Sequence, residues 1–140
     1  MQSGMQEGFV ELLEALASRY YPGLFAVIDD TAEELLGRPG LRAHIMVGHS
    51  PSMHLDGIVA IAMVSPTPLP SRSLPQDWQD ILEASKSKPL RVDLFVLKGD
   101  AIRAQTLARD LNPRALVIPL PPGSRKAVAG RTRPKFQKSK

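Results

Sequence analysis

The chain has 140 residues, 43% of them hydrophobic and 23% charged, with a formal net charge of +4 and no cysteine. Its length suits a single folded domain, and its composition excludes a wholly disordered chain. The absence of cysteine excludes disulfides and thiolate metal ligands. No window approaches the roughly 18 apolar residues of a membrane-spanning helix, and acids interrupt the first apolar stretch. We therefore expect a cytoplasmic protein with no signal peptide and no membrane contact.

The spacing of apolar residues predicts helices and strands in alternation along the chain. In the first segment, apolar residues recur at helical spacing until Pro22-Gly23 ends the pattern. Thr31 and Glu34 have the spacing of a capping box, and Asp100 stands where it would cap a later helix. The expected helices cover residues 5–21, 32–37, 75–85 and 101–111, and the expected strands cover residues 24–28, 41–47, 53–65, 91–97 and 115–120.

Two pairs of strands indicate how the sheet is built. Residues 41–47 and 53–65 are separated by a short polar turn and predict an antiparallel β-hairpin. Residues 91–120 have the length of a βαβ unit, whose strands should be parallel with a right-handed crossover. We predict one α/β or α+β domain with a mixed sheet of about five strands and helices packed on it. Four prolines in residues 65–75 predict an extended, exposed loop between the two pairs.

Charge is divided unevenly along the chain. Residues 123–140 contain seven basic residues and no acid, whereas residues 1–122 contain 11 basic residues and all 14 acids. The C-terminal segment therefore carries +7 and the rest of the chain −3. We predict a compact domain over residues 1–122 and a basic, disordered tail over residues 123–140. The basic tail residues, which we predict to contact nucleic-acid phosphates, are Arg125, Lys126, Arg131, Arg133, Lys135, Lys138 and Lys140.

All three histidines lie within eleven residues, and an aspartate follows them. If the hairpin turns around Ser50, His44 faces Asp56 across the two strands, with His54 two residues away on the same face. This face would be the one turned away from the core. Two imidazoles and a carboxylate suit Zn²⁺, Mn²⁺ or Fe²⁺, so His44, His54 and Asp56 are candidate metal ligands. A His–Asp pair also suits general-base catalysis, and the alternative is a solvated strand end.

Carboxylates near strand ends form a second candidate site. Aspartates on adjacent strands can hold Mg²⁺ for phosphoryl transfer, since hard cations prefer oxygen ligands. Asp93 lies inside an apolar strand and therefore needs a partner, for which Arg91 is the simplest candidate. Asp29 and Asp30 precede a predicted helix and can act there as cap and dipole partners. With the histidine cluster, the candidate catalytic residues are His44, His54, Asp56 and Asp93.

The order of some of these residues resembles that of minimal nucleotidyltransferases. Gly48-His49-Ser50 precedes Asp56, and Val92-Asp93-Leu94 follows a predicted helix. In that family a Gly-x-Ser type of turn precedes an Asp-x-Asp strand, and a third aspartate follows in a later strand. The second acid of the Asp-x-Asp strand is replaced by Ile58. The resemblance thus implies a degenerate copy that has lost two-metal catalysis.

The predicted order of helix, three strands, helix and strand is also similar to that of restriction-endonuclease-like nucleases. Their Glu-x-Lys signature on the third strand has no counterpart in residues 57–65. The aromatic residues Phe9, Tyr20, Tyr21, Phe25, Trp78 and Phe95 stand at positions that predict burial, so no platform for stacked bases is expected.

We therefore predict a small, non-enzymatic module that associates with DNA, RNA or a nucleoprotein complex through its basic tail. The acidic body would contact a protein partner. Two alternatives remain. One is a metal-dependent phosphotransfer or hydrolytic enzyme that uses the histidine and aspartate cluster, and the other is an adaptor that binds only protein.

Overall fold

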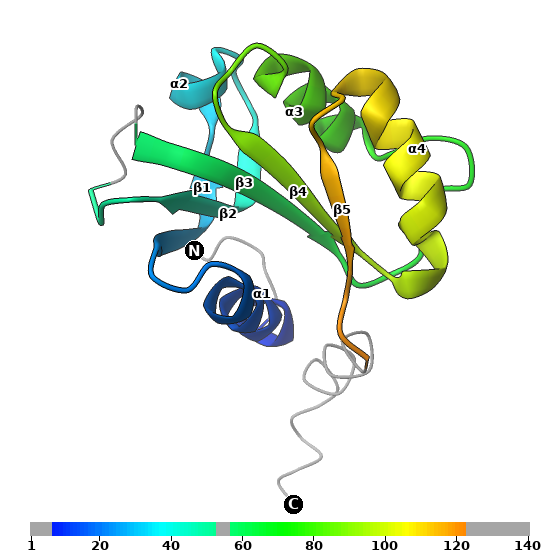
Figure 1. Ribbon diagram of the computed structural model, residues 1–140, viewed down its shortest axis with the longest axis horizontal. Helices are drawn as coiled ribbons and strands as arrows, with labels where there is room; N and C mark the ends of the chain where they lie inside the picture. Colours follow the sequence, from blue (N-terminus) through cyan, green and yellow to red (C-terminus); the bar gives the residue numbers. More distant parts are fainter. Residues whose placement is uncertain (1–6, 53–56, 123–140) are drawn as a thin grey trace, which may run out of the picture.

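The computed structural model describes residues 7–52 and 57–122, which form helices and strands in alternation (Figure 1). A five-stranded sheet lies at the centre. The strands are β1 (Phe25–Thr31), β2 (Arg42–Gly48), β3 (Ile58–Ser65), β4 (Arg91–Val96) and β5 (Leu116–Pro119). The helices are α1 (Glu7–Tyr20), α2 (Glu33–Leu36), α3 (Gln76–Ser85) and α4 (Ala101–Leu111), and a 3₁₀ turn, η2 (Lys98–Asp100), precedes α4.

The strands lie in the sheet in the order in which they occur in the chain. β1 pairs with β2, and β2 with β3, in antiparallel fashion. β3, β4 and β5 are parallel to one another. The predicted antiparallel hairpin and the predicted parallel pair around α4 are both confirmed, as is a mixed α/β sheet of five strands. α3 adds a second parallel crossover, which connects β3 to β4.

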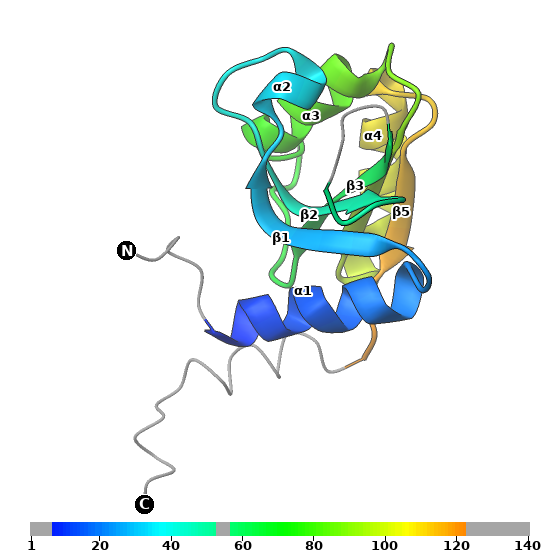
Figure 2. The same ribbon diagram turned by 90° about the vertical axis from the view of Figure 1, so that its left-hand side faces the viewer.

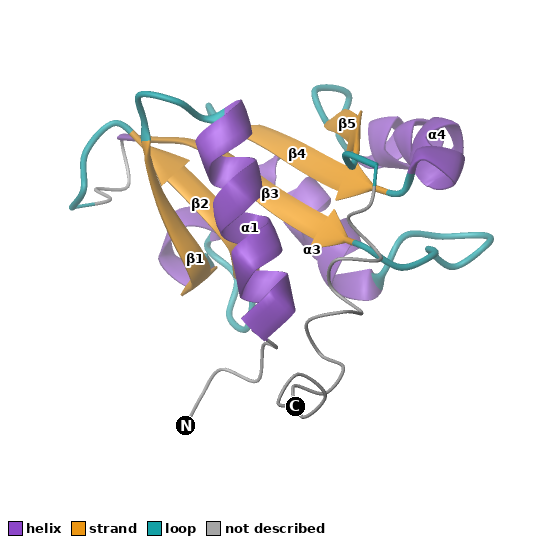
Figure 3. Cartoon of the chain, turned by 90° about the horizontal axis from the view of Figure 1, so that it is seen from below, coloured by secondary structure: helices purple, strands orange, loops and turns teal. Residues whose placement is uncertain are grey.

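Helices cover both faces of the sheet. Figures 2 and 3 show α1 lying across one face, while α2, α3 and α4 lie on the other. On the α1 side, Leu13 and Leu16 pack against sheet residues that include Val64 and Phe95. On the opposite side, α3 contributes Trp78 and two further buried apolar residues to a larger core. Because both faces are covered, the middle strands are apolar almost throughout instead of alternating.

This two-sided burial corrects the expectation of a solvated face on the hairpin. Ile45 and Val47 of β2 pack toward α1, whereas Met46 packs toward the other helices. The predicted register is also wrong. Ile45 pairs with Ala62, and a shift between Val47 and Gly48 marks an irregularity in the ladder. The connection between β2 and β3 is therefore longer than a tight turn around Ser50, and residues 53–56 within it lie outside the described residues.

The proline loop is anchored more firmly than its composition predicts. Leu69 and Leu74 are buried, at 7% and 3% exposure. The Asp100 carboxylate accepts a hydrogen bond from the Leu69 N–H at 3.0 Å and pairs with Arg103 at 2.8 Å. Arg103 also donates to the Pro70 carbonyl. Asp100 stands at the N-cap position of α4 but forms no side-chain cap bond, so the predicted cap is replaced by a loop anchor.

The start of α2 also differs from the predicted capping box. Thr31 ends β1, and its hydroxyl accepts a 3.3 Å hydrogen bond from the Glu33 N–H. The Glu33 carboxylate accepts from the Gly40 N–H at 2.7 Å. The Glu33 carboxylate therefore stabilises the turn that follows α2. Glu34 does not form the reciprocal bond of the predicted capping box.

Candidate functional site

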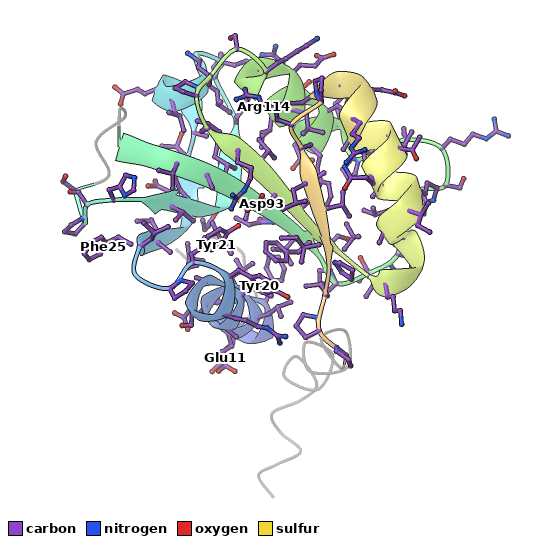
Figure 4. All side chains as sticks on the ribbon, viewed as in Figure 1. Glu11, Tyr20, Tyr21, Phe25, Asp93 and Arg114 are labelled. Carbon is purple, nitrogen blue, oxygen red and sulfur yellow. The ribbon has the colours of Figure 1, made fainter. Side chains whose placement is uncertain are left out.

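Asp93 is completely buried in the middle of the sheet, on the side covered by α1. Its Oδ2 accepts a 2.5 Å hydrogen bond from the Tyr21 hydroxyl. Nε and Nη2 of Arg91 donate to the two carboxylate oxygens at 2.6 and 3.0 Å. Figure 4 shows Tyr21, just after α1, and Asp93 in β4 close to each other. The three side chains link the end of α1 to the sheet.

Electrostatics support a structural role for this group. The hydrogen bond with Asp93 raises the pKa of Arg91 above its usual value. Burial, and then the charge and hydrogen bond of Asp93, raise the pKa of the Tyr21 hydroxyl. A buried carboxylate is costly without partners, and here two donors satisfy both of its oxygens. The predicted pairing of Asp93 with Arg91 is confirmed.

His44 lies half-buried between β3 and α1. Its Nδ1 accepts a 2.8 Å hydrogen bond from the backbone N–H of Val64, and its ring meets that of Phe9 edge-on, with 5.1 Å between centroids. Burial lowers the pKa of His44. An imidazole that accepts at Nδ1 is neutral, with its proton on Nε2. The side chain therefore takes the place of a backbone acceptor in the ladder between β2 and β3.

The remaining predicted ligands are not brought together in the described residues. His54 and Asp56 lie outside the described residues, and the register that would place His44 opposite Asp56 is not formed. Within residues 7–52 and 57–122, no group of three or more His, Asp or Glu side chains could hold a metal ion. Asp29 pairs with Arg42 at 3.1 Å, and Asp30 accepts from the Thr31 N–H.

The two enzyme resemblances are not strengthened by this arrangement. In the nucleotidyltransferase-like pattern, Asp93 would face a metal, but its oxygens are bonded to Tyr21 and Arg91. The helix, three-strand, helix, strand order of nuclease-like enzymes does occur, with α2 inserted between β1 and β2. β3 itself carries no charged side chain for a Glu-x-Lys site.

Exposed aromatic surface is limited. Phe25 at the start of β1 is 46% exposed, which corrects the prediction that it is internal. It lies on an edge strand, where one side of the chain has no neighbouring strand in the described sheet. Trp78 and Phe95 are buried, and Phe9 and Tyr20 are half-buried. The single exposed Phe, Tyr or Trp ring among residues 7–52 and 57–122 does not form a platform on which successive bases could stack.

An open groove of about 510 Å³ lies between the second half of α1 and β1. Glu14 and Ser18 line it from the helix, and Ala26 and Ile28 line it from the strand. No described side chain in it has the pattern of a nucleophile beside a base, so it carries no candidate chemistry of its own.

Arg114 was not predicted as a functional residue, but it joins two connections at one end of the sheet. Its Nη2 donates to the carbonyls of Ser85, Lys86 and Lys88 at 3.4, 3.0 and 2.7 Å. Figure 4 shows Arg114 at the end of the sheet where α3 and β5 come together. The nearby buried Asn112 donates to Ser85 Oγ at 3.1 Å. The connections before β4 and before β5 are thereby tied into one surface.

The seven basic residues of residues 123–140 lie outside the described residues, but the described segment just before them is held to the sheet. Leu120 is buried with the core on the α1 side, and its N–H donates to the Val96 carbonyl at 2.8 Å. The described chain ends at Pro122, two residues later.

No protein-family model, curated protein or solved structure matches this chain. The function must therefore be argued from the chain itself. None of the helices in the described stretches is long and apolar enough to cross a membrane.

Proposed function

We propose that this protein is a non-enzymatic module that binds nucleic acid through the basic segment at residues 123–140. The separation of charge supports this proposal most directly, because seven basic residues without an acid follow a domain whose own charge is negative. A cationic segment gains free energy by releasing counterions condensed on nucleic-acid phosphates. The anchor at Leu120 would hold this segment to a folded body.

The bonding of the candidate catalytic groups favours this function over an enzymatic one. Asp93 is bonded to Tyr21 and Arg91, and His44 Nδ1 accepts from the Val64 N–H. Both groups stabilise the sheet in these positions. In this proposal the folded domain positions the tail, and the acidic residues of the domain contact a protein partner.

The test is binding of labelled DNA and RNA to the full chain, measured by fluorescence anisotropy between about 50 and about 200 mM salt. In the test variant, all seven basic tail residues are changed to glutamine in the full-length protein. A matched control keeps the tail composition but scrambles its order. We expect the wild type and the scrambled control to bind with steep salt dependence, and the glutamine variant to bind at least about 100-fold more weakly at the low salt concentration.

The outcomes separate the proposal from its alternatives. Failure of the wild-type chain to bind either nucleic acid at low salt contradicts it and favours the protein-only adaptor. Unchanged binding by the glutamine variant would also contradict it, because affinity would then come from another surface. Binding by the wild type but not by the scrambled control would show that tail order matters, which phosphate contacts alone do not require.

A further inference from the structure

The domain itself carries a basic surface at one end of its sheet. This basic end consists of five residues from the α3–β4 connection, the start of β4, the last turn of α4 and the connection to β5. The acids at this end are Glu83 in the last turn of α3, Asp93 in β4 and Asp110 in α4, so basic residues outnumber acids by five to three. The residues of the basic end are Lys86, Lys88, Arg91, Arg109 and Arg114.

Backbone register brings two of these arginines to the same end of adjacent strands. β4 and β5 run parallel, and Asp93 pairs with Leu116. Arg91 and Arg114 each stand two residues before that pair. Figures 1 and 2 show the connections that lead into β4 and β5 side by side at this end of the molecule.

Both arginines are held in place by bonds that use only part of the guanidinium group. Arg91 uses Nε and Nη2 for Asp93, and Arg114 uses Nη2 for three carbonyls. Both residues are exposed, and each guanidinium carries N–H groups beyond those used in these bonds. A fixed guanidinium with outward N–H groups suits phosphate oxygens, because little side-chain freedom is lost on binding.

The two arginines bond on opposite sides of the sheet, Arg91 to Asp93 on the α1 side and Arg114 to the end of α3, and the lysines lie in the connection that Arg114 contacts. Lys86 is exposed and Lys88 half-buried, and neither forms an ion pair within the described residues. Arg109 is exposed in the last turn of α4. Positive charge near the C-termini of α3 and α4 also stabilises the helix dipoles. Stabilisation of the two helix dipoles explains one basic residue at the end of each helix, but it does not explain five basic residues at one end of the sheet.

We propose that the basic end is a second phosphate-contacting surface, and that it binds the same nucleic acid as the tail. This inference rests on the proposed function and extends it, since it assigns part of the binding to the folded domain. The partner is a polyanion long enough to reach both elements, and the contacts are to its phosphate backbone rather than to base edges.

Distances along the chain allow both contacts at once. The tail leaves the domain beside Val96, five residues along β4 from Arg91, which corresponds to about 17 Å of strand. The 18 residues after Pro122 can span at most about 60 Å when extended. A duplex of about 24 base pairs, with one phosphate per strand about every 3.4 Å, is therefore long enough to meet the basic end and the tail together.

The experiment compares two full-length double variants that each remove two positive charges from the domain. The test variant is Lys86→Gln/Lys88→Gln, which changes the basic end without touching the bonds of Arg91 and Arg114. The control is Arg72→Gln/Lys98→Gln, whose residues are exposed in the proline loop and η2. Affinity for the labelled duplex is measured from about 50 to about 200 mM salt.

We expect the test variant to reduce the slope of log affinity against log salt by up to about 2, since each phosphate contact contributes about 0.9. The control should leave the slope unchanged. Adding Lys86→Gln/Lys88→Gln to the variant with a neutral tail should abolish its residual binding. Far-UV circular dichroism and urea midpoints check that both double variants remain folded.

The failures of the two proposals are distinguishable. If the neutral tail abolishes all binding while the test variant binds like the control, the basic end makes no contact and the proposed function stands. If both double variants weaken binding equally, domain charge acts without a defined surface, which also overturns the inference. No binding by the wild type overturns both proposals.

Discussion

The imidazole of His44 accepts a hydrogen bond from the backbone N–H of Val64, 2.8 Å away, and so completes the ladder between β2 and β3 with a side chain. A histidine that seemed a metal ligand or general base thereby becomes part of the sheet. The bond requires an unprotonated Nδ1, which makes the stability of the domain depend on pH near neutrality.

The first prediction concerns this pH dependence. Burial holds the pKa of His44 below 6.5, against the opposing influence of Asp77 and Asp29. The unfolded chain therefore binds a proton at a higher pH than the folded chain, and stability is lost as pH falls below about 6.5. Urea denaturation at a series of pH values between about 7.5 and about 5.5 measures the effect.

Two variants separate charge from hydrogen bonding at this position. His44→Asn keeps an acceptor near Nδ1 but does not titrate, so it should remove the pH dependence at modest cost. His44→Leu leaves the Val64 N–H without its acceptor and should cost about 1–3 kcal/mol at neutral pH. An identical pH dependence in wild type and His44→Asn would contradict the assignment.

A second prediction concerns the ion pair between Arg91 and Asp93. Arg91→Leu leaves a carboxylate that is 0% exposed with Tyr21 as its remaining partner, and should destabilise the domain by about 3 kcal/mol. Because the Arg91 side chain is 51% exposed, solvent should keep the cost at this lower end of the range for buried pairs.

The double variant Arg91→Leu/Asp93→Leu should be less destabilised than Arg91→Leu alone, since no unpaired charge remains. Urea unfolding at neutral pH provides both free energies of unfolding. If the double variant loses as much free energy of unfolding as Arg91→Leu alone, or more, then Arg91 stabilises the domain independently of the Asp93 carboxylate.

The third prediction concerns Tyr21 at alkaline pH. Its pKa is raised in the folded state, while the unfolded chain ionises tyrosine near pH 10. Stability should therefore fall as pH rises above about 10, because the unfolded state releases a proton that the folded state retains. Absorbance at an ultraviolet wavelength specific for tyrosinate follows the titration.

Tyr21→Phe provides the comparison. Below the pH of unfolding, the tyrosinate absorbance of this variant should equal that of the wild type. At neutral pH its free energy of unfolding should be lower by about 1.5–3 kcal/mol, because a hydrogen bond to a charged group is lost. A decrease of the signal in this variant before unfolding would mean that Tyr21 ionises in the folded protein.

A fourth prediction concerns Arg114. Its Nη2 donates to the carbonyls of Lys86 and Lys88 in the connection after α3, with the Ser85 carbonyl at 3.4 Å, so Arg114→Ala should destabilise the domain by about 1–3 kcal/mol. Arg114→Lys should recover part of this loss, because an ammonium group can donate to the same oxygens with less regular geometry. Thermal unfolding of both variants measures the difference, and equal midpoints for wild type and Arg114→Ala would contradict the role.

Local patterns in the sequence were sufficient for much of the fold. The connection lengths around α4 predicted parallel strands, and the need of a carboxylate in an apolar strand for a partner pointed to Arg91 beside Asp93. Tyr21 was not predicted as the third member, because it lies 72 residues away and only the packing of α1 on the sheet brings it close. Phe25 seemed internal from its apolar run, but sheet order placed it on an edge.

The hairpin register could not be predicted for a physical reason. Register is inferred from alternation between a buried and an exposed face, and both faces of β2 and β3 are covered by helices. The irregularity between Val47 and Gly48 then displaces the pairing further. Similarly, the basic end is assembled from separate connections, so its charges are dispersed in the sequence and become a surface only when β4 and β5 are adjacent.

The bond from the Leu120 N–H to the Val96 carbonyl also has a mechanical consequence. A force applied to the chain beyond Leu120 along the axis of β5 would strain the bonds between β4 and β5 together in shear rather than opening them one by one. Leu120, buried beside α1, adds resistance at the point where the load enters. A load that enters at the C-terminal end of β5 would therefore be shared among the bonds that join it to β4.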